Sequence, residues 1–428
     1  MSIQTIHPAK NISGSFRVPG DKSVSHRYAL LAGLASGTSR LTNFSTGADS
    51  HSSLACMAAL GAQVVQNQDG TIDVTGTAGS FHQPPSPLDC GNSGSTMRML
   101  AGLIAPHPGT FTLIGDASLT PRPMERIRTP LAQMGAQIEL TSGHAPLTIT
   151  GKPLKAIDFS TPIPSAQIKT AILFAGLQAE GTTSISESVR TRDPSAHALR
   201  AFGATLTRTK QSISIHGRQQ LRATNTTIPG DISSAAFFLC AALLFPDSNL
   251  VLDGLGMNPT RAALLDVLIA IGLKIKVLNL EEINGEMIGT IQINSSKTLS
   301  GYNIAGPLTA QLIDELPVLA AIAPFTTDGL KIRDAAELRV KESDRIALVA
   351  KNLAAMGATF TEHPDGLDIP GNQQLHGAPI DSGHDHRIAM AFSIAALRAS
   401  GPTEIHHAEA ASISFPEFYA LLDSVSVR

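Results

Sequence analysis

The sequence predicts an α/β (α+β) fold built from six similar units of about 70 residues, and two recurring features support this prediction. A glycine separates an apolar helical stretch from a β-like run at Gly61, Gly135, Gly203, Gly272 and Gly357. About 40 residues before each glycine, a polar turn opens a stretch rich in Ala, Leu and Ile. Each unit is therefore expected to run from cap to buried helix, strand, amphipathic helix, glycine and strand.

The polar turns supply the side chains expected to cap the buried helices. We take as caps Ser23, Ser95, Ser165, Ser233, Asp314 and Asp385. Such caps satisfy amide groups at helix starts, and several helix N-termini aimed at one region would attract anions. The sixth unit lacks the glycine, and its helix-to-strand junction is expected near residue 424. A repeat scaffold without a common site is the alternative.

Composition excludes several classes of protein. With 428 residues, of which 43% are hydrophobic and 16% charged, the chain is typical of a globular protein with more than one core. A formal charge of −3 argues against a general nucleic-acid binder. No apolar run approaches the roughly 20 residues that span a bilayer, so we expect residues 236–245 to form a buried helix.

Cys56, Cys90 and Cys240 are odd in number and far apart, so neither a disulfide framework nor a Cys-x-x-Cys metal site is predicted. This usage fits a reducing compartment. The sequence MSIQTIHPAK lacks the basic-then-apolar pattern of a signal peptide. We therefore expect a cytoplasmic monomer without a nucleic-acid or membrane partner.

The first polar turn, VPGDKSVSHR, combines Lys22, Ser23 and Arg27 with a helix start. Ser23 and Arg27 are four residues apart and would share one helix face. A cation, a hydroxyl group, an arginine and a helix N-terminus together suit a phosphate or carboxylate. The spacing is not that of a P-loop. A capped helix with solvated charges is the alternative.

Two further segments could present groups to an anion. CGNSGSTMR at 90–98 is rich in glycine and would let backbone amides approach a ligand closely. In GDASLTPRPMER at 115–126, Arg122 stands between two prolines that stiffen the backbone. For Arg122, a functional and a structural role are equally compatible with the sequence.

PSAQIKTAI at 164–172 places polar side chains at the start of an otherwise apolar helix. Ser165, Gln167 and Lys169 need partners if they are buried, and ordinary capping is the simpler interpretation. TRDPSAH adds Arg192, which is less specific by itself.

The second half of the chain supplies the acid–base candidates. In LIDELPVLAA, Asp314 heads an almost wholly apolar helix, where capping is a strong alternative. In AELRVKESDRIA, a helical conformation would place Lys341 four residues from Arg345 and Glu342 three residues from it. A solvated charged face is the alternative for this run.

SGHDHRIAMAF at 382–392 places two histidines and an arginine before an apolar helix. His384 and His386 have metal-like spacing, but no further ligand stands at a convincing distance, so a metal is not expected. Arg387 at the helix start is better interpreted as an anion ligand.

Taken together, these segments resemble the EPSP synthase family along essentially the whole chain. The resemblance is carried by the order GDKSxSHR, GNSG, RPM, SAQ, DE, RVKESDR and DHRIAM, with NPTR at 258–261 and SFPEF at 414–418. It implies two similar globular domains, each of three βαβαββ units, with the active site in the cleft between them. The implied domains are 20–229 and 1–19 plus 230–428.

The resemblance also implies a reaction. Family members transfer the enolpyruvyl group of phosphoenolpyruvate to the 5-hydroxyl of shikimate 3-phosphate, by addition and elimination through a tetrahedral intermediate, in the biosynthesis of chorismate and aromatic amino acids. No metal or organic cofactor is implied. Each substrate carries about three negative charges near neutral pH, so lysines and arginines are needed to hold the two together.

Carried over motif by motif, the resemblance assigns the site residues. The catalytic residues are Asp314, Glu342 and Lys22. Shikimate 3-phosphate is held by Lys22, Ser23, Arg27, Ser165, Ala166, Gln167, Arg192, Asp314 and Lys341. Phosphoenolpyruvate is held by Lys22, Gly94, Arg122, Gln167, Arg345 and Arg387. Asp314 accepts the proton of the 5-hydroxyl, while Glu342 and Lys22 handle the proton of the methylene carbon.

The chain departs from the family pattern at three positions. Many members have a lysine shortly before the C-terminal Phe-Pro, where residues 412–414 are Ser, Ile and Ser. Glu337 replaces a frequent asparagine. Gly94 stands where a larger residue is associated with tolerance of glyphosate. Sensitivity to that inhibitor stays open.

Two rival interpretations remain. The enolpyruvyl transferases that act on UDP-N-acetylglucosamine share the repeat fold, but they carry a reactive Cys or Asp just before their Arg-Pro. Residues 117–123, ASLTPRP, contain neither, and Asp116 lies too early. The other rival is a noncatalytic repeat scaffold, against which the clustering of acidic and basic residues at helix starts argues.

Overall fold

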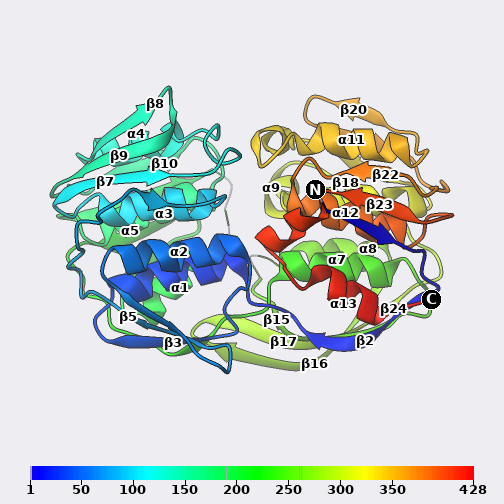
Figure 1. The fold of residues 1–428 in the computed structure, drawn as a ribbon, viewed down its shortest axis with the longest axis horizontal. Coiled ribbons are helices and arrows are strands. Elements are labelled where there is room, and N and C mark those ends of the chain that lie inside the picture. Colours follow the sequence, from blue (N-terminus) through cyan, green and yellow to red (C-terminus); the bar gives the residue numbers. More distant parts are fainter. Residues whose placement is uncertain (1, 189–190, 192, 260, 262) are drawn as a thin grey trace. The chain divides into compact units, whose positions relative to one another are not determined.

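The chain folds into two compact units. We describe a computed structural model that covers residues 2–188, 191, 193–259, 261 and 263–428. The N-terminal unit comprises Gly20–Ile228 and Ile283–Gly285. The C-terminal unit comprises Met1–Pro19, Pro229–Glu282 and Glu286–Arg428. Each unit has its own hydrophobic core and is described by itself (Figure 1).

The N-terminal unit contains three four-stranded sheets with one shared topology. Their strand orders are β14-β3-β5-β4, β6-β7-β9-β8 and β10-β11-β13-β12. In each sheet the first pair of strands is parallel and the next two pairs are antiparallel. The strands are β3 (Thr38–Thr42), β4 (Gln63–Gln66), β5 (Ile72–Thr75), β6 (Leu88–Asp89), β7 (Gly109–Ile114), β8 (Gln137–Thr141), β9 (His144–Gly151), β10 (Asp158–Thr161), β11 (Thr182–Glu187), β12 (Leu206–Arg208), β13 (Ser212–His216) and β14 (Thr226–Thr227).

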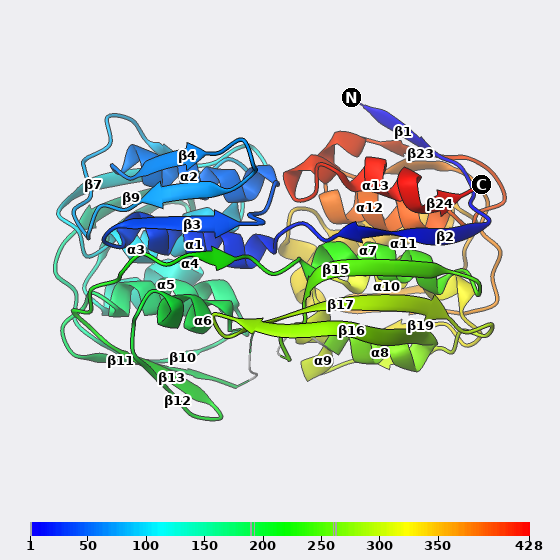
Figure 2. The same ribbon diagram turned by 90° about the horizontal axis from the view of Figure 1, so that it is seen from below.

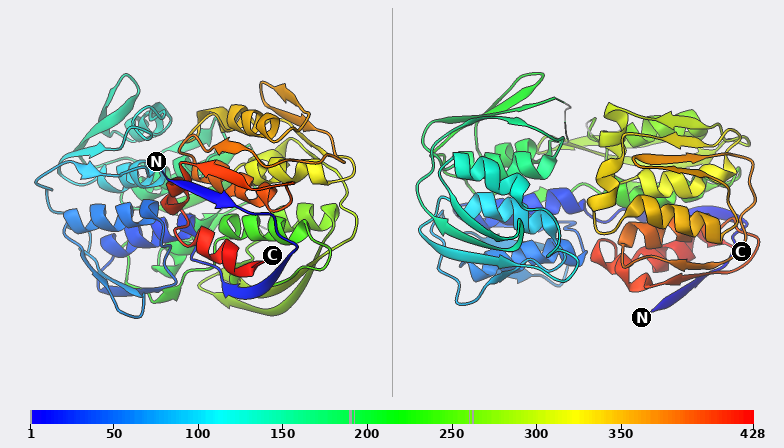
Figure 3. Two further views of the ribbon diagram at one scale, coloured as in Figure 1. Left: turned by 45° about the vertical axis from the view of Figure 1, so that its right-hand side comes forward. Right: turned by 90° about the horizontal axis from the view of Figure 1, so that it is seen from above.

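Two helices accompany each of these sheets, which gives the predicted βαβαββ repeat three times. The helices are α1 (Lys22–Leu34), α2 (Ala48–Ala59), α3 (Gly94–Ile104), α4 (Glu125–Gln133), α5 (Ala166–Gly176) and α6 (Pro194–Ala201). The first helix of each repeat, namely α1, α3 and α5, is almost wholly buried, and α3 packs against both α1 and α5. Apart from polar residues near their starts, these helices are largely apolar, because the sheets and the outer helices surround them (Figure 3).

The C-terminal unit contains three more sheets, which complete the six repeats. Their strand orders are β16-β17-β15-β2-β24, β18-β19-β21-β20 and β1-β23-β22. The strands are β1 (Ile3–Ile6), β2 (Asn11–Arg17), β15 (Asn249–Gly256), β16 (Leu273–Ile283), β17 (Glu286–Ser295), β18 (Tyr302–Ile304), β19 (Leu330–Ile332), β20 (Thr361–His363), β21 (Gly366–Ile369), β22 (Pro379–Asp381), β23 (Thr403–His406) and β24 (Ser426–Val427). Figure 2 shows β2, β15, β17 and β16 side by side.

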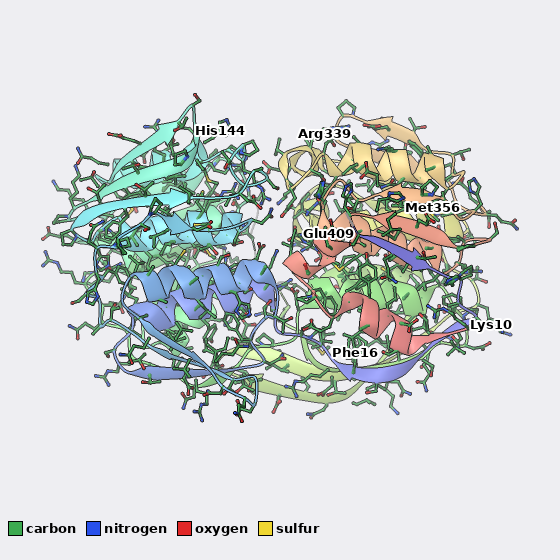
Figure 4. The ribbon with its side chains drawn as sticks, viewed as in Figure 1. Lys10, Phe16, His144, Arg339, Met356 and Glu409 are labelled. Atoms are coloured by element: carbon green, nitrogen blue, oxygen red, sulfur yellow. The ribbon has the colours of Figure 1, made fainter. Side chains whose placement is uncertain are left out.

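Three buried helices again form the centre of the unit. The helices are α7 (Ile232–Leu243), α8 (Ala263–Ile271), α9 (Pro307–Leu312), α10 (Leu316–Ile322), α11 (Arg345–Ala355), α12 (His386–Ala396) and α13 (Phe418–Val425), with 3₁₀ turns η1 (Ala323–Phe325), η2 (Ala336–Val340) and η3 (Ala408–Ile413). Helices α7, α10 and α12 pack against one another. Phe16, labelled in Figure 4, contacts Phe238 of α7 with ring centroids 4.7 Å apart. Helix α7 contains most of the apolar run expected to be a buried helix, and all its residues are buried.

The chain exchanges a strand each time it passes from one unit to the other. Strand β2 precedes α1 in the sequence, yet it pairs in parallel with β15 of the C-terminal unit. Strand β14 lies just before α7, yet it pairs in parallel with β3 of the N-terminal unit. The last strand, β24, pairs with β2 rather than with its own repeat. The helix-to-strand junction expected near residue 424 lies between α13 and β24, as predicted.

The five repeated glycines end the second helices of their repeats, as the sequence predicts. Their φ angles are +109° at Gly61, +102° at Gly135, +90° at Gly203, +140° at Gly272 and +84° at Gly357. Side chains disfavour such angles, whereas glycine adopts them without a steric penalty.

Three of the predicted helix caps lie two residues too late. The capping oxygens belong to Asp21, Ser93 and Asp231 rather than to Ser23, Ser95 and Ser233, because each helix starts two residues earlier than expected. Ser165 and Asp385 cap α5 and α12, as predicted.

Asp314 is not a cap. It lies between α9 and α10, where Pro317 stands in the first turn of α10. Proline is tolerated in the first turn of a helix because main-chain amides there have no hydrogen-bond acceptor within the helix. The predicted apolar helix is α10, which begins two residues after Asp314, and Asp314 lies in the connection from α9. Among the described residues, no helix is long and apolar enough to cross a membrane.

Gly135→Ala should destabilise the protein through backbone strain alone. A Cβ atom at Gly135 would meet nothing within 4 Å, so the added methyl group has space. The positive φ angle should still lower the free energy of unfolding by about 1–2 kcal/mol. Gly401→Ala is the matched control, since it has equal space and no positive φ angle. Thermal unfolding of both variants measures the difference, and equal melting temperatures would contradict the strain argument.

Candidate active site

In the N-terminal unit, the starts of the three buried helices are tied together by polar contacts. Gln167 at the start of α5 donates from Nε2 to Ser95 Oγ at the start of α3, at 2.9 Å. Thr96 of α3 and His26 of α1 both contact the hydroxyl of Ser53, each at 2.8 Å. The helix N-termini of this unit therefore meet in one region, as the repeat pattern predicts.

Lys22 and Arg27 are held differently at the start of α1. Lys22 Nζ forms an ion pair with Asp49 at 3.1 Å. Arg27 is buried and donates to Ser23 O at 2.6 Å, Ser195 Oγ at 2.7 Å and Thr170 Oγ1 at 2.9 Å. These acceptors are neutral oxygens, and they fix the orientation of the guanidinium group.

His26 lies one residue before Arg27 on the same helix. Burial, and then the charges of Lys22 and Arg27, hold the pKa of His26 well below its usual value. The ring is therefore neutral near pH 7, and it serves as a polar link between helices rather than as a charged ligand.

Gly94 is the first residue of α3 and lies beside Arg122. A Cβ atom at Gly94 would stand 3.2 Å from Nη1 of Arg98 and 3.5 Å from Nη1 of Arg122. Arg122 is 8% exposed and donates to Asn92 Oδ1 at 2.9 Å and Ser118 Oγ at 3.0 Å. The glycine thus leaves space directly in front of an oriented guanidinium group.

Arg98 is a residue that the sequence interpretation did not select. It donates from Nη1 to Oε1 of Gln167 at 2.6 Å, which orients the Gln167 amide. Its position in the CGNSGSTMR motif was the available signal. Ser165 caps α5 by accepting from Ile168 N, so that Ala166 and Gln167 form the first turn of that helix.

Lys169 has a structural role. Its Nζ is 2.8 Å from carboxylate oxygens of both Glu187 and Asp193, and only 1% of the side chain is exposed. It joins α5 to β11 and to the start of α6. Arg192 lies outside the described residues.

In the C-terminal unit, Asp314 and Arg387 lie together. Arg387, in the first turn of α12, donates from Nη1 to the main-chain oxygen of Asp314 at 2.7 Å. Nη2 of Arg387 and Nη1 of Arg345 are each 4.0 Å from a carboxylate oxygen of Asp314. The carboxylate is 24% exposed, so it can meet both solvent and a ligand.

Arg345 is the most buried cation of this group, with 1% of its side chain exposed. It donates to Asp385 Oδ2 at 2.8 Å and to Glu342 Oε2 at 2.6 Å. Burial alone would lower the pKa of the guanidinium group, but the charges of Asp385 and Glu342 outweigh burial and raise it. Burial would likewise raise the pKa of Asp385, yet Arg345 keeps it below its usual value.

Lys341 does not share a helix with Arg345, contrary to the expectation. Helix α11 begins at Arg345 with Asp344 as its cap, and Lys341 ends the preceding 3₁₀ turn. The expected ion pair between Glu342 and Arg345 is present nevertheless. Burial lowers the pKa of Lys341, although Asp314 and Glu342 partly oppose this effect. An ammonium group with a lowered pKa releases its proton more readily.

Arg339 is not part of this cluster. It donates to Glu362 Oε1 at 2.9 Å and to the main-chain oxygens of His363 and Pro364, which fastens the β20 hairpin (Figure 4). Residues 412–414, where the family lysine is replaced, end turn η3 and follow it. Among the described residues, no group of three or more His, Cys, Asp or Glu side chains is arranged to hold a metal.

Each unit therefore presents an oriented set of cations at helix starts, and the C-terminal unit adds carboxylates that are partly exposed. Cations held in this way suit anionic substrates, and a carboxylate beside them can accept a proton. The two units of three βαβαββ repeats, together with these groups, define an α/β protein whose helix starts can hold anionic ligands beside a proton acceptor.

Comparison with known proteins identifies the family. The model of "EPSP synthase (3-phosphoshikimate 1-carboxyvinyltransferase)" matches residues 6–422. The 3-phosphoshikimate 1-carboxyvinyltransferase of Koribacter versatilis is 57% identical over 423 residues, covering 99% of each chain. That of Solibacter usitatus is 53% identical and covers 98% of this chain and 99% of its own. The chain belongs to the EPSP synthase family.

Solved structures support the assignment of the fold and of the family. An EPSP synthase from Acinetobacter baumannii is 40% identical, with a TM-score of 0.87 over 99% of this chain and 98% of its own. The enolpyruvyl transferase NikO from Streptomyces tendae has a TM-score of 0.80 over 99% and 97% of the two chains, at 19% identity, and shares the fold. The predicted fold, family and enzyme class are confirmed.

Asp385→Asn should destabilise the C-terminal unit by removing a counter-charge of buried Arg345. The asparagine keeps a capping oxygen for α12, so the substitution removes the negative charge and leaves the cap in place. We expect the free energy of unfolding to fall by about 3 kcal/mol. Asp381→Asn is the matched control, because Asp381 pairs with the exposed Lys351 and its loss should cost about 1 kcal/mol or less.

The same pair predicts a pH dependence. Because the folded state lowers the pKa of Asp385, its stabilising effect is present above the unfolded pKa of about 4 and is lost as the pH falls through the folded value. Denaturant titrations from pH 7 to pH 3 should therefore show a steeper loss of stability for the wild type than for Asp385→Asn. Parallel curves would contradict this assignment.

Proposed function

We propose that this enzyme transfers the enolpyruvyl group of phosphoenolpyruvate to the 5-hydroxyl of shikimate 3-phosphate, releasing phosphate and 5-enolpyruvylshikimate 3-phosphate. The observation that carries the proposal is the cluster of Asp314, Glu342, Arg345 and Arg387, in which two carboxylates lie beside two oriented guanidinium groups. Membership of the EPSP synthase family indicates which reaction is catalysed. The carboxylates of this cluster can act as the acid and base that the reaction needs.

The proposal uses both units. In the N-terminal unit, Lys22, Ser23, Arg27, Ser165, Ala166, Gln167 and Arg192 bind shikimate 3-phosphate, together with Lys341 of the C-terminal unit. Phosphoenolpyruvate binds to Lys22, Gly94, Arg122, Gln167, Arg345 and Arg387. The neutral hydrogen-bond partners of Arg27 and Arg122 support this division, since they orient each guanidinium group for an anionic ligand.

Catalysis requires one proton to leave the sugar-like hydroxyl and another to be added to the methylene carbon and then removed. Asp314 accepts the hydroxyl proton. Glu342 and Lys22 handle the methylene proton, and the arginines stabilise the charge of the tetrahedral phospho-ketal intermediate. Placing two anions in reacting geometry lowers the barrier further, because association is completed before the chemical step. No cofactor is needed for these steps.

We place the reaction in the cytoplasm, in the biosynthesis of chorismate and aromatic amino acids. The three cysteines are free and buried, which fits a reducing compartment. Neither a nucleic acid nor a membrane is a partner in this proposal.

The test is a phosphate-release assay with phosphoenolpyruvate and either shikimate 3-phosphate or UDP-N-acetylglucosamine. The proposal predicts phosphate release when shikimate 3-phosphate is the acceptor, and none when UDP-N-acetylglucosamine is the acceptor. Turnover only with the nucleotide sugar would favour the other enolpyruvyl transferase. No turnover with either acceptor would favour a noncatalytic scaffold.

Asp314→Ala should lower turnover far more than it weakens binding of shikimate 3-phosphate. A placed general base contributes about 10²- to 10⁴-fold, so kcat should fall by that factor. Calorimetry would report the Kd of shikimate 3-phosphate, which should change little by comparison. Asp328→Ala, which removes an exposed carboxylate of the same unit, serves as the control. Equal losses in kcat and affinity would assign Asp314 to binding instead.

Gly94→Ala should weaken the phosphoenolpyruvate side of the site selectively. The added methyl group would stand 3.2 Å from Arg98 and 3.5 Å from Arg122, which is close enough to shift Arg98 and disturb its neighbour. We expect KM for phosphoenolpyruvate to rise by about tenfold, since small displacements of orienting groups are costly. Steady-state kinetics with each substrate varied in turn would check this. A larger rise in KM for shikimate 3-phosphate would contradict the assignment of Gly94.

A further inference from the structure

The ion pair between Lys22 and Asp49 joins the starts of two helices of the N-terminal unit. Lys22 is the first residue of α1, and Asp49 is the second residue of α2, which lies beside α1 (Figure 1). The 3.1 Å contact is largely shielded from solvent, since 15% of the Lys22 side chain and 8% of the Asp49 side chain are exposed. Water and salt weaken such a pair less than they weaken a pair at the surface.

A second polar contact between α1 and α2 keeps Asp49 opposite Lys22. Four residues farther along each helix, His26 Nδ1 contacts Ser53 Oγ at 2.8 Å. Residues four apart lie on one face of a helix, so the same faces of α1 and α2 make both contacts. The second contact therefore fixes how the two helices lie against each other, and with it the place of the carboxylate.

The carboxylate of Asp49 contacts one charged side chain among the described residues, that of Lys22. Its Oδ2 accepts the hydrogen bond from Nζ, while its buried Oδ1 has no hydrogen-bond partner in the described part of the chain. Helix α2 has no side-chain cap at Gly47, so the carboxylate of Asp49 does not serve the start of that helix either. Its contacts therefore indicate that Asp49 holds Lys22. A stabilising effect on α2 through the helix dipole is the alternative role.

Lys22 needs such a contact because its side chain is flexible. The ammonium group stands on a stem of four carbons, whose rotational freedom is lost when the group is held in one place. Proton transfer requires donor and acceptor atoms about 2.6–3.2 Å apart, and a displacement of about 1 Å can lower the rate about 10²-fold. A carboxylate that fixes Nζ before the substrates bind should therefore increase the rate.

We propose that Asp49 is a positioning residue, which holds the ammonium group of Lys22 where the methylene proton is exchanged. The inference rests on the proposed function, because it gives Asp49 a part in the same reaction. Asp49 touches neither substrate, and its effect on turnover passes through Lys22. A change at Asp49 therefore alters kcat only while Lys22 is present.

Phosphate release by four proteins tests the proposal: the wild type, Asp49→Asn, Lys22→Gln and the double variant. Asp49→Asn keeps the size of the side chain and removes its charge, so kcat should fall about 10²-fold. In the Lys22→Gln background, the same substitution should change the rate less than about twofold, because the two residues act as a unit. Single-turnover assays extend the comparison to the slow Lys22→Gln proteins. Equal factors in the two backgrounds would overturn the proposal, since Asp49 would then act independently of Lys22.

Two further variants separate positioning from the stability of α2. Asp49→Glu keeps the charge and should retain kcat within about tenfold of the wild-type value. Ser50→Ala is the matched control, since Ser50 is buried in the same turn of α2 and its hydroxyl has no hydrogen-bond partner among the described residues. It should leave kcat and the melting temperature unchanged. If Asp49→Asn lowers the melting temperature and leaves kcat near the wild-type value, Asp49 only stabilises the helix and the proposal is wrong.

Magnetic resonance of the lysine side chains gives a readout that does not depend on activity. A lysine ammonium group held by a carboxylate exchanges its protons with water slowly enough to be observed. The wild type should show a Lys22 signal that Lys22→Gln lacks, and Asp49→Asn should lose it while Ser50→Ala keeps it. Absence of the signal from the wild type, or its survival in Asp49→Asn, would overturn the inference. A wild type without turnover would contradict the proposed function instead, so the two failures are distinguishable.

Discussion

The need to hold buried charge at helix starts constrains both units of this enzyme. Arg345 shows the constraint most clearly, because a guanidinium group with 1% of its side chain exposed is stable there only with Asp385 and Glu342 beside it. Asp385 is itself the cap of α12, so one carboxylate compensates a buried charge and satisfies the amide of Arg387. The ion pair and the start of the helix therefore depend on each other.

In the N-terminal unit, the lysines Lys22 and Lys169 pair with carboxylates, whereas the described hydrogen bonds of Arg27 and Arg122 go to neutral oxygens. Arg27 and Arg122 donate to hydroxyl, amide and main-chain oxygens, and Gln167 is oriented by Arg98. Such partners fix the position and orientation of a guanidinium group. The repeat makes this possible, because three helices with similar surroundings bring their positive N-terminal ends into one region. The repeated fold and the meeting of these helix ends thus have one physical origin in this protein.

Because the chain exchanges strands between repeats, the sequence pattern could not predict which strands pair. The units counted along the chain have the right length and number, but β2 and β14 belong to sheets whose remaining strands are distant in sequence. Periodicity identifies which residues form strands, whereas pairing depends on which faces are buried together.

The sequence by itself determined the α/β class, the sixfold repeat, the glycines at helix ends and the family, since these follow from local spacing and motif order. It also selected Asp314, Glu342, Arg345 and Arg387, which do lie together. Only the tertiary structure decided that Asp314 connects two helices, that Lys169 pairs with Glu187 and Asp193, and that Arg98 orients Gln167. These roles depend on contacts between distant residues, and a capping motif and a ligand site look alike until such contacts are known.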